Sequence, residues 1–345
     1  MMQVARAAGV SVMTVSYAYS QPARVSEQAA AKVRAAAREL GYPGPHPGAR
    51  SLRRGRAGSL GIVLGERLAY AFEDPQAARF LAGVAAVCAD NAVGLTLVPV
   101  TGEDGDVERI AEAAVDGFVV WTSADDDPVV DAVAASGLPA VVHGGPHRQS
   151  LPVVGIDDRA AARAIGREAF AGARRPAVLS FPLDRSRRSR LLAGPEPASA
   201  TYPVTRHRLE GFKDAWRELG GRWADLQVAV CPSNSAGHGE ALAAELLAGD
   251  DARDAIAAMS DELALGALHA AAQARLVVPD ALAVTGWDDS DAAARAGLTT
   301  VAQSLRDQGA RCARIALRQE QPTSRHDHAP WEVTRRDSTR ARRGS

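Results

Sequence analysis

The sequence has little that would cross-link the chain or anchor it in a membrane. Its 345 residues include three cysteines, Cys88, Cys231 and Cys312, which are widely separated. An odd, scattered set excludes a disulfide framework and fits the reducing cytoplasm. No apolar run approaches the ~20 residues that span a bilayer, and residues 1–6 lack the basic and apolar regions of an export signal. We therefore expect a cytoplasmic protein with no membrane partner.

The sequence also lacks the short motifs of common enzymes. It contains no G-x-S-x-G, no glycine-rich phosphate loop ending in Lys-Ser/Thr, no C-x-x-C and no H-E-x-x-H. Acidic clusters at 103–106 and 125–127 lack the ligand spacing of a calcium loop and are interpreted as solvated turns. The segment 326–328, His-Asp-His, leaves a weak metal site only as a minor alternative. We expect no enzymatic activity, no cofactor and no metal.

The formal net charge of −1 hides an uneven distribution. Residues 1–56 carry nine Arg or Lys and two acidic residues, whereas the rest of the chain carries 31 basic and 39 acidic residues. A basic head on an acidic body is typical of a module that binds a polyanion, attached to a domain with another task. The alternative is an ordinary solvated helical surface rich in arginine.

Residues 1–46 have the pattern of a helix-turn-helix domain. Gly9 supplies the turn between two short helices, and Ser11 is suited to cap the second. The small Ala5 allows the helices to cross closely, and Val15 is expected to pack at the crossing. A third helix carries Ala29, Val33, Ala36, Ala37 and Leu40 at helical spacing. The predicted helices cover residues 2–8, 11–19 and 26–40.

The second helix is predicted to present an unusual outer face. A solvated helix rarely exposes Val, Met and Tyr together, but a helix in the major groove does so. There, apolar groups meet thymine methyls, and hydroxyls meet phosphates or base edges. The alternative is that this face packs on a neighbouring domain. The predicted DNA-contacting residues of this helix are Ser11, Val12, Met13, Thr14, Ser16, Tyr17 and Ser20.

Residues 47–58 have the composition of a linker, and the chain after them alternates strands with helices. Hydrophobic residues make up 46% of the sequence and charged residues 23%, as in soluble globular proteins. Strand-helix alternation predicts doubly wound parallel sheets, and the number of strands requires two lobes. Ligands of such sheets bind off the carboxyl ends of the strands, here between the lobes. The predicted strands are 60–64, 95–100, 117–121, 140–143, 153–156, 177–180, 227–230 and 283–286.

The predicted body covers residues 59–345. The N-lobe is placed at about 59–158 and 290–322, and the C-lobe at about 159–289 and 323–340. The basic run 185–190 and the Ser/Ala/Pro-rich stretch 195–203 are expected to form a mobile loop at the mouth of the cleft. This α/β body is similar to that of periplasmic binding proteins.

Motifs along nearly the whole chain resemble the lactose/galactose-repressor family of bacterial transcriptional regulators. In the head, the resemblance lies in residues 4–11, 14–16, 25–26, 32–33, 39–42 and 49–52. In the body, it lies in residues 208–212, 259–267, 278–279, 284–289 and 298–303.

The resemblance implies a homodimer on a pseudo-palindromic operator, located at the nucleoid. Residues 47–54 would form a hinge helix that folds on DNA, with Leu52 in the minor groove and Arg50 and Arg53 beside it. A small-molecule effector, sugar or sugar-like, would sit between the lobes. The implied effector-binding residues are Arg208, Ser260, Asp261, Trp287 and Asp288. Trp287 could offer a flat apolar face to a sugar ring, and the alternative is that it packs in the core. A switch follows as a hypothesis: the effector bridges Arg208 on one lobe to Asp261 and Asp288 on the other.

The chain departs from the family pattern at several positions. Tyr17 stands where many members carry an arginine, Ser260 replaces a common asparagine, and Gly144 lies where some members have a polar sugar ligand. Because the first helix lacks a capping residue, we expect either that the functional start lies a few residues upstream of Met1 or that this head binds DNA poorly as written.

Three other functions stay open on the sequence alone. A periplasmic-type solute-binding protein would share the body but would need an export signal and no basic head. A sugar-metabolising enzyme would need a catalytic pair in the cleft, which we cannot assemble. A regulator whose ligand is a co-repressor cannot be separated from one whose ligand is an inducer.

Overall fold

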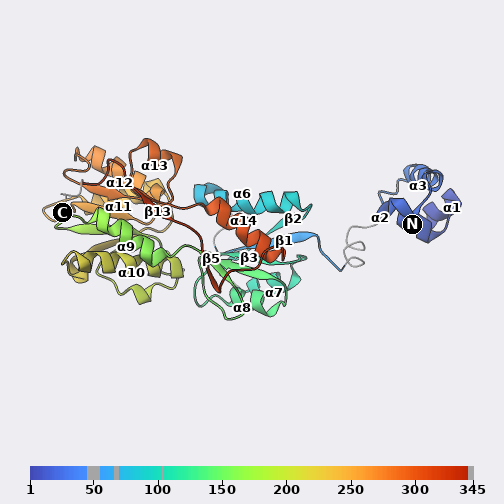
Figure 1. The fold of residues 1–345 in the computed structure, drawn as a ribbon, viewed down its shortest axis with the longest axis horizontal. Helices are drawn as coiled ribbons and strands as arrows, with labels where there is room; N and C mark the ends of the chain where they lie inside the picture. Colours follow the sequence, from blue (N-terminus) through green and yellow to red (C-terminus); the bar gives the residue numbers. More distant parts are fainter. Residues whose placement is uncertain (45–54, 66–69, 103, 341–345) are drawn as a thin grey trace. The chain divides into compact units, whose positions relative to one another are not determined.

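The computed structural model describes residues 1–44, 55–65, 70–102 and 104–340, and the chain divides into two compact units, 1–58 and 59–345 (Figure 1). Within these described ranges, the helices are all too short or too polar to cross a membrane.

Three α-helices and a short 3-10 helix build the described part of the head. The α-helices are α1 (Met2–Ala8), α2 (Val12–Ser20) and α3 (Glu27–Glu39), with η1 (Pro22–Arg24) between the last two. Gly9 ends α1 at φ 64°, a left-handed conformation that glycine adopts without strain. Ser11 caps α2 by accepting a 3.0 Å hydrogen bond from the amide of Thr14. The predicted helix-turn-helix is confirmed.

The head has its own small hydrophobic core. Ala5 of α1 and Val15 of α2 pack together as predicted, against Val33 of α3. The predicted inner face of α3 needs two corrections. Ala30, rather than Ala29, is buried, and Leu40 is exposed because α3 ends at Glu39.

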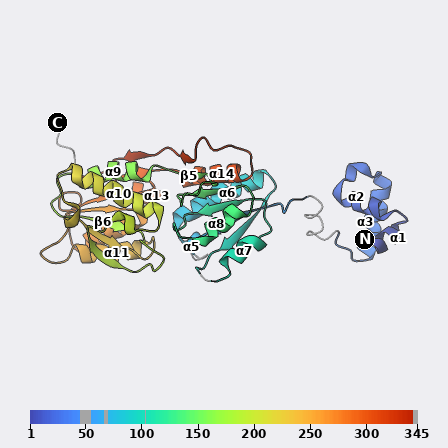
Figure 2. The same cartoon turned by 90° about the horizontal axis from the view of Figure 1, so that it is seen from below.

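The N-lobe of the body is a parallel sheet with helices on both faces. Its strands lie in the order β12-β5-β4-β3-β1-β2. α6 and α14 pack on one face, and α7 and α8 pack on the other (Figures 1 and 2). The strands are β1 (Ser59–Leu64), β2 (Gly94–Pro99), β3 (Phe118–Trp121), β4 (Ala140–His143), β5 (Val153–Gly155) and β12 (His326–His328). The helices are α5 (Tyr70–Glu73), α6 (Pro75–Asp90), α7 (Asp106–Glu112), α8 (Pro128–Ala135) and α14 (Leu305–Ala316).

The C-lobe repeats this plan with the order β10-β9-β6-β8-β7, in which only the edge strand β7 is antiparallel. α9 and α10 cover one face, and α11 and α12 cover the other. The strands are β6 (Pro176–Ser180), β7 (Arg190–Ala193), β8 (Gln227–Val230), β9 (Ala255–Ala258) and β10 (Ala283–Thr285). The helices are α9 (Asp158–Ala169), α10 (Pro203–Glu218), α11 (Ala236–Leu246), α12 (Asp261–Gln273) and α13 (Asp291–Arg295), with the 3-10 turns η2 (Pro197–Ser199) and η3 (Trp223–Asp225). A separate antiparallel pair joins β11 (Thr300–Ala302) to β13 (Glu332–Thr334).

The predicted two-lobed α/β fold is confirmed, but the predicted lobe boundaries near the C-terminus are wrong. Ala293 and Leu298 belong to the C-lobe core, so residue 290 does not begin an N-lobe segment. β12 pairs with β5 and therefore belongs to the N-lobe, not to the C-lobe. The polar sequence of β12 carries no strand signal, and only pairing with the sheet edge makes it a strand.

Candidate functional site

The exposed face of α2 carries most of the residues predicted to contact DNA. Val12 is 44% exposed and Met13 is 63% exposed, although both are apolar, and Thr14 and Tyr17 are partly exposed beside them. Ser16 is a correction: it is only 8% exposed and faces the interior of the head. Ser20 is half-buried, and its hydroxyl donates to the carbonyl of Ser16 at 2.8 Å.

Tyr17 is paired with a cation. The guanidinium carbon of Arg24, in η1, lies 5.6 Å from the centroid of the Tyr17 ring. This cation–π contact places an arginine next to the exposed face of α2, even though α2 itself contains none. Arg50, Leu52 and Arg53 lie outside the described residues, so their DNA contacts stay predictions.

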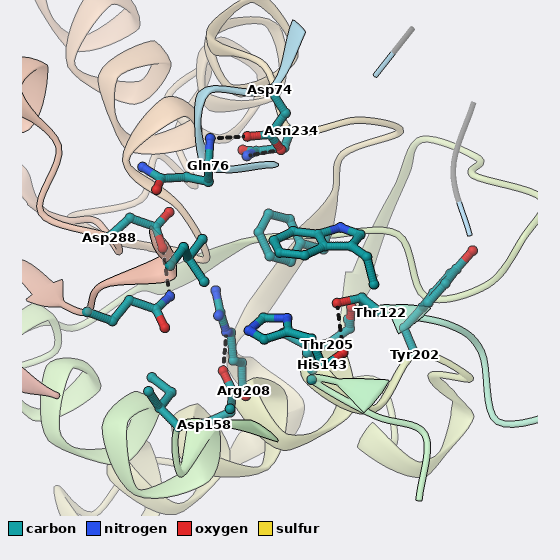
Figure 3. Close-up of a pocket in the computed structure, with 18 of the residues that line it drawn as sticks. Asp74, Gln76, Thr122, His143, Asp158, Tyr202, Thr205, Arg208, Asn234 and Asp288 are labelled. Atoms are coloured by element: carbon teal, nitrogen blue, oxygen red, sulfur yellow. Dashed lines mark hydrogen bonds and ion pairs between the residues drawn. The ribbon is translucent and has the colours of Figure 1, made fainter. Parts of the chain in front are cut away.

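A cavity of about 120 Å³ lies between the two sheets of the body (Figure 3). It is bounded by residues that follow the carboxyl ends of strands in both lobes, where open α/β sheets bind ligands. The polar residues that line it are Asp74, Gln76, Thr122, His143, Asp158, Arg187, Tyr202, Thr205, Arg208, Asn234, Asp288, Gln303 and Gln308. Trp121 and Phe181 contribute aromatic surface.

Arg208 of α10 is the best-fixed cation in the cavity wall. Its Nε lies 2.7 Å from Oδ1 of Asp158, and its Nη1 donates to the carbonyl of Met259 at 2.5 Å. The guanidinium carbon also lies over the indole of Trp287, 3.8 Å from the ring centroid. Arg208 and Asp158 are both buried, so each charge depends on the other. The predicted position of Arg208 at the cleft is therefore consistent with the structure.

Asp288 follows β10 and also faces the cavity. Its Oδ1 accepts a hydrogen bond from Nε2 of Gln303 at 2.8 Å. Burial raises the pKa of Asp288 well above its ordinary value, and the nearby carboxyl of Asp261 raises it further. Asp288 can therefore accept hydroxyl hydrogens or, when protonated, donate one.

Asp261 and Ser260 were predicted to bind the effector, but they lie behind the cavity lining and form hydrogen bonds within the C-lobe. Asp261 accepts from the amide of Ser290 and from the hydroxyl of Thr300, both at 2.7 Å. Burial raises the pKa of this carboxyl to about 6. Ser260 caps α12 by accepting from the amide of Leu263 and donates to Oδ1 of Asn234 at 2.5 Å. Neither residue lines the cavity, because these polar atoms join segments of the C-lobe.

Trp287 is a core residue. It is fully buried within the hydrophobic cluster of the C-lobe, and Arg208 covers its ring on the cavity side. The interpretation of Trp287 as a flat surface for a sugar ring is therefore wrong, since Trp287 does not line the cavity. The alternative of core packing is confirmed.

All five predicted effector residues lie in the C-lobe, which overturns the bridging hypothesis in its original form. Arg208 and Asp288 stand on the same lobe, so an effector held only between them would not join the lobes. The opposite wall comes from N-lobe residues that the sequence reasoning missed: Asp74, Gln76, Trp121, Thr122, His143 and Gln308. The signal that could have found two of them is position, because Trp121 ends β3 and His143 ends β4.

His143 is held firmly in the N-lobe wall. Its Nε2 lies 2.8 Å from Oε1 of Gln308, and its ring stacks on Trp121 with centroids 4.8 Å apart. Burial lowers the pKa of His143 to about 4, so the ring is neutral near pH 7. The adjacent Gly144 has φ 71°, and a Cβ there would lie 2.9 Å from Cγ2 of Val204. A side chain at position 144 would therefore crowd the side chain of Val204 and hold a φ that L-residues rarely adopt.

Direct contacts join the lobes around the cavity. Nδ2 of Asn234 donates to Oδ2 of Asp74 at 3.0 Å, and Arg206 forms an ion pair with Asp125. Of the two stretches expected to form a mobile loop, 195–203 contains the 3-10 turn η2, and 185–190 leads into β7 at Arg190. Two residues of this region, Arg187 and Tyr202, line the cavity.

Comparison with known proteins places both parts of the chain. Residues 1–44 match the model for bacterial regulatory proteins of the lacI family, and residues 171–339 match that for a periplasmic binding protein-like domain. An HTH-type transcriptional regulator from Mycobacterium tuberculosis is 38% identical over 315 residues, covering 90% of this chain and 88% of that protein. The chain belongs to the LacI family.

Other relatives share the full two-part architecture. The regulator IpsA of Corynebacterium glutamicum is 34% identical over 323 residues, covering 91% of this chain and 89% of that protein. A solved LacI-family regulator from C. glutamicum has a TM-score of 0.75 at 28% identity, covering 98% of both chains. A complex of the regulator CelR with cellobiose has a TM-score of 0.67 at 25% identity, covering 97% of this chain and 98% of that chain. The protein is thus a LacI-family DNA-binding transcriptional regulator.

Proposed function

We propose that this LacI-family regulator represses transcription under the control of a neutral, polyhydroxylated effector of about monosaccharide size. The effector binds in the cavity between the lobes. The observation that carries this proposal is the cavity wall itself, in which Arg208 and Asp288 of the C-lobe and His143 of the N-lobe are buried around one cavity (Figure 3). Burying such groups is unfavourable unless they are paired, which favours a polar occupant.

The chemistry of the wall suits hydroxyl groups. A carboxylate such as Asp288 accepts hydrogens from neighbouring hydroxyls, and the guanidinium of Arg208 donates in a fixed plane. Trp121 and Phe181 offer aromatic faces for the C–H surface of a ring. A volume of about 120 Å³ fits one sugar-sized ring better than a long chain.

The charge of the wall favours a neutral effector over a phosphorylated one. The charged lining residues are three aspartates and two arginines: Asp74, Asp158, Asp288, Arg187 and Arg208. Arg208 is already paired with Asp158, so it cannot neutralise a phosphate without leaving that carboxylate unpaired. Because its raised pKa favours the uncharged form of Asp288, the net charge of the lining residues is closer to zero.

Relatives support an effector of this class. CelR was solved with cellobiose, and the ribose operon repressor of Escherichia coli is 27% identical over 317 residues. We infer a binding function rather than catalysis, with the effector released unchanged. We further infer a cytoplasmic homodimer on nucleoid DNA, where α2 of each protomer reads one half of a pseudo-palindromic operator.

The experiment combines calorimetry with DNA binding by the full chain. Neutral monosaccharides and cyclic polyols, and the phosphate ester of each, are titrated into wild type and Asp288→Asn. Wild type should bind one neutral compound, the ester should bind at least tenfold more weakly, and Asp288→Asn should lose binding. Chromatography should recover the compound unchanged after incubation.

Operator DNA is then selected from a random library, and its affinity for the protein is measured with and without the effector. An effector that couples by ~1–3 kcal/mol changes operator affinity ~5- to 150-fold. By reciprocity, the operator changes effector affinity by the same factor, which separates an inducer from a co-repressor. Preference for the phosphate ester, or full binding by Asp288→Asn, would refute the proposed site.

A further inference from the structure

Four side chains at the cavity edge form one continuous hydrogen-bonded relay from the C-lobe to the N-lobe. Nε2 of Gln303 donates to Oδ1 of Asp288 at 2.8 Å, and Nε2 of Gln308 donates to Oε1 of Gln303 at 3.1 Å. The relay ends at His143, whose Nε2 lies 2.8 Å from Oε1 of Gln308. It therefore links β10, the crossover before α14, α14 itself and β4.

The relay has a single direction. A carboxamide carries its donor and its acceptor on different atoms, so each glutamine fixes the polarity of the next bond. Because the amide nitrogen of Gln308 is committed to Gln303, its oxygen faces His143 and can only accept. Nε2 of His143 must then carry the proton, which leaves Nδ1 as a bare acceptor in the neutral ring.

Nδ1 of His143 is the open end of the relay. It has no hydrogen-bond partner among the described residues, and His143, which is 94% buried and lines the cavity, contacts the rings of both Phe80 and Trp121. The charged groups that act on this ring are Asp158 and Arg208, which form an ion pair with each other in the C-lobe. The proton on Nε2 is therefore set by the relay rather than by a nearby charge.

We propose that His143 is a specificity-determining contact for the effector, and that the relay from Asp288 fixes its ring so that Nδ1 accepts a hydroxyl hydrogen. The inference rests on the proposed function and makes it sharper. The effector must present one hydroxyl to Asp288 on the C-lobe and a second to Nδ1 of His143 on the N-lobe. A compound with a carbonyl, a methoxy group or hydrogen at the second position leaves that nitrogen unpaired.

The relay is tested first without effector, on the full chain with ¹⁵N-labelled histidine. Long-range ¹H–¹⁵N spectra should show His143 as the Nε2–H tautomer, with no titration between pH 5.5 and 8. Gln308→Glu places a carboxylate, which cannot donate to Gln303, next to His143, and it should shift the titration of His143 upward into this range. Gln319→Glu is the matched control: it adds the same charge at an exposed position just beyond α14 and should leave His143 unchanged. An Nδ1–H tautomer in wild type, or titration near pH 6.5, would overturn the relay.

The specificity role is tested with deoxy and O-methyl analogues of the neutral compound that binds wild type. His143→Phe retains the stack on Trp121 but has no ring nitrogen. It should bind the parent compound about tenfold more weakly, and it should no longer distinguish the parent from one particular deoxy analogue. Unchanged discrimination in His143→Phe would overturn this role. Failure of every compound to bind wild type would instead refute the proposed function, while the tautomer measurement would still decide the relay.

Discussion

The head and the cleft are built in opposite ways. The exposed face of the head comes from one short helix, and its residues Val12, Met13, Thr14 and Tyr17 are close together in sequence. The cleft takes residues from Asp74, the N-cap of α6, to Gln308 in α14, across both lobes. The first surface needs only that α2 forms and packs, whereas the second needs the whole body to fold. A substitution on the exposed face of the head can therefore change DNA binding without changing stability, whereas a substitution in the cleft should change both.

The two surfaces also differ in how their side chains are solvated. The α2 face leaves apolar side chains in water, which are available for a partner. The cleft removes charges from water and holds them by partners such as Asp158 for Arg208. In a buried network each group depends on the others, because an unpaired charge in a low-dielectric interior is strongly unfavourable. Stability and binding should therefore be coupled in the cleft and separable in the head.

The largest expected effect is at Arg208. Arg208→Ala leaves Asp158 buried without its cation and should lower the free energy of unfolding of the body by ~3–5 kcal/mol. Arg159→Ala is the control, because Arg159 is a 55% exposed residue of α9 that pairs on the surface with Asp214. Its loss should change stability by less than ~1 kcal/mol. All five tryptophans lie between positions 121 and 331, so tryptophan fluorescence during urea unfolding follows the body alone. Equal losses of unfolding free energy in the two variants would show that the buried ion pair stabilises the body no more than the exposed one.

A smaller effect is expected at Gly144, in the N-lobe wall. Gly144 and Gly137 have nearly the same φ, 71° and 70°, but a Cβ at Gly137 meets nothing within 4 Å. Gly137→Ala should therefore lose only the ~1 kcal/mol of backbone strain. Gly144→Ala adds crowding against Val204 and should lose ~1–3 kcal/mol more. The same urea unfolding measures both variants. If Gly144→Ala loses no more stability than Gly137→Ala, the side chain of Val204 moves to accept the new Cβ.

The difference between elements formed by neighbouring residues and sites assembled from distant ones also explains what the sequence could predict. The helices of the head and most strands of both sheets lie within one or two residues of their predicted bounds, because glycine turns, serine caps and apolar runs are local signals. β9 was missed because its Ala-Ile-Ala-Ala sequence has little of the β-branched character of a strand.

The cleft was predicted only in part, for a related reason. Resemblance located Arg208 and Asp288, which line the cavity. It also suggested Asp261, but sequence position could not show that both of its oxygens accept hydrogen bonds from Ser290 and Thr300. Gln308 had no signal, and Gln303 ended a family-like motif but received no role, since the role of both comes from a relay that exists only after α14 has docked beside β4.

The smallest effect separates binding from stability in the head. Met13 is 63% exposed on α2, and Met2 is 79% exposed on α1. Neither belongs to the buried core of the head, so replacing either by alanine should leave the helical circular dichroism and thermal unfolding of the head unchanged. Met13→Ala should nevertheless weaken operator binding by ~1 kcal/mol, about fivefold, because it removes one apolar contact in the major groove. Met2→Ala should have no such effect. Fluorescence anisotropy with selected operator DNA and with a scrambled duplex of equal length measures both, and the loss for Met13→Ala should be confined to the operator. Equal weakening on both duplexes would mean that Met13 supports the head in general. In that case α2 would not recognise the operator sequence through this face. Binding and stability would then not be separable in the head, contrary to the difference from the cleft.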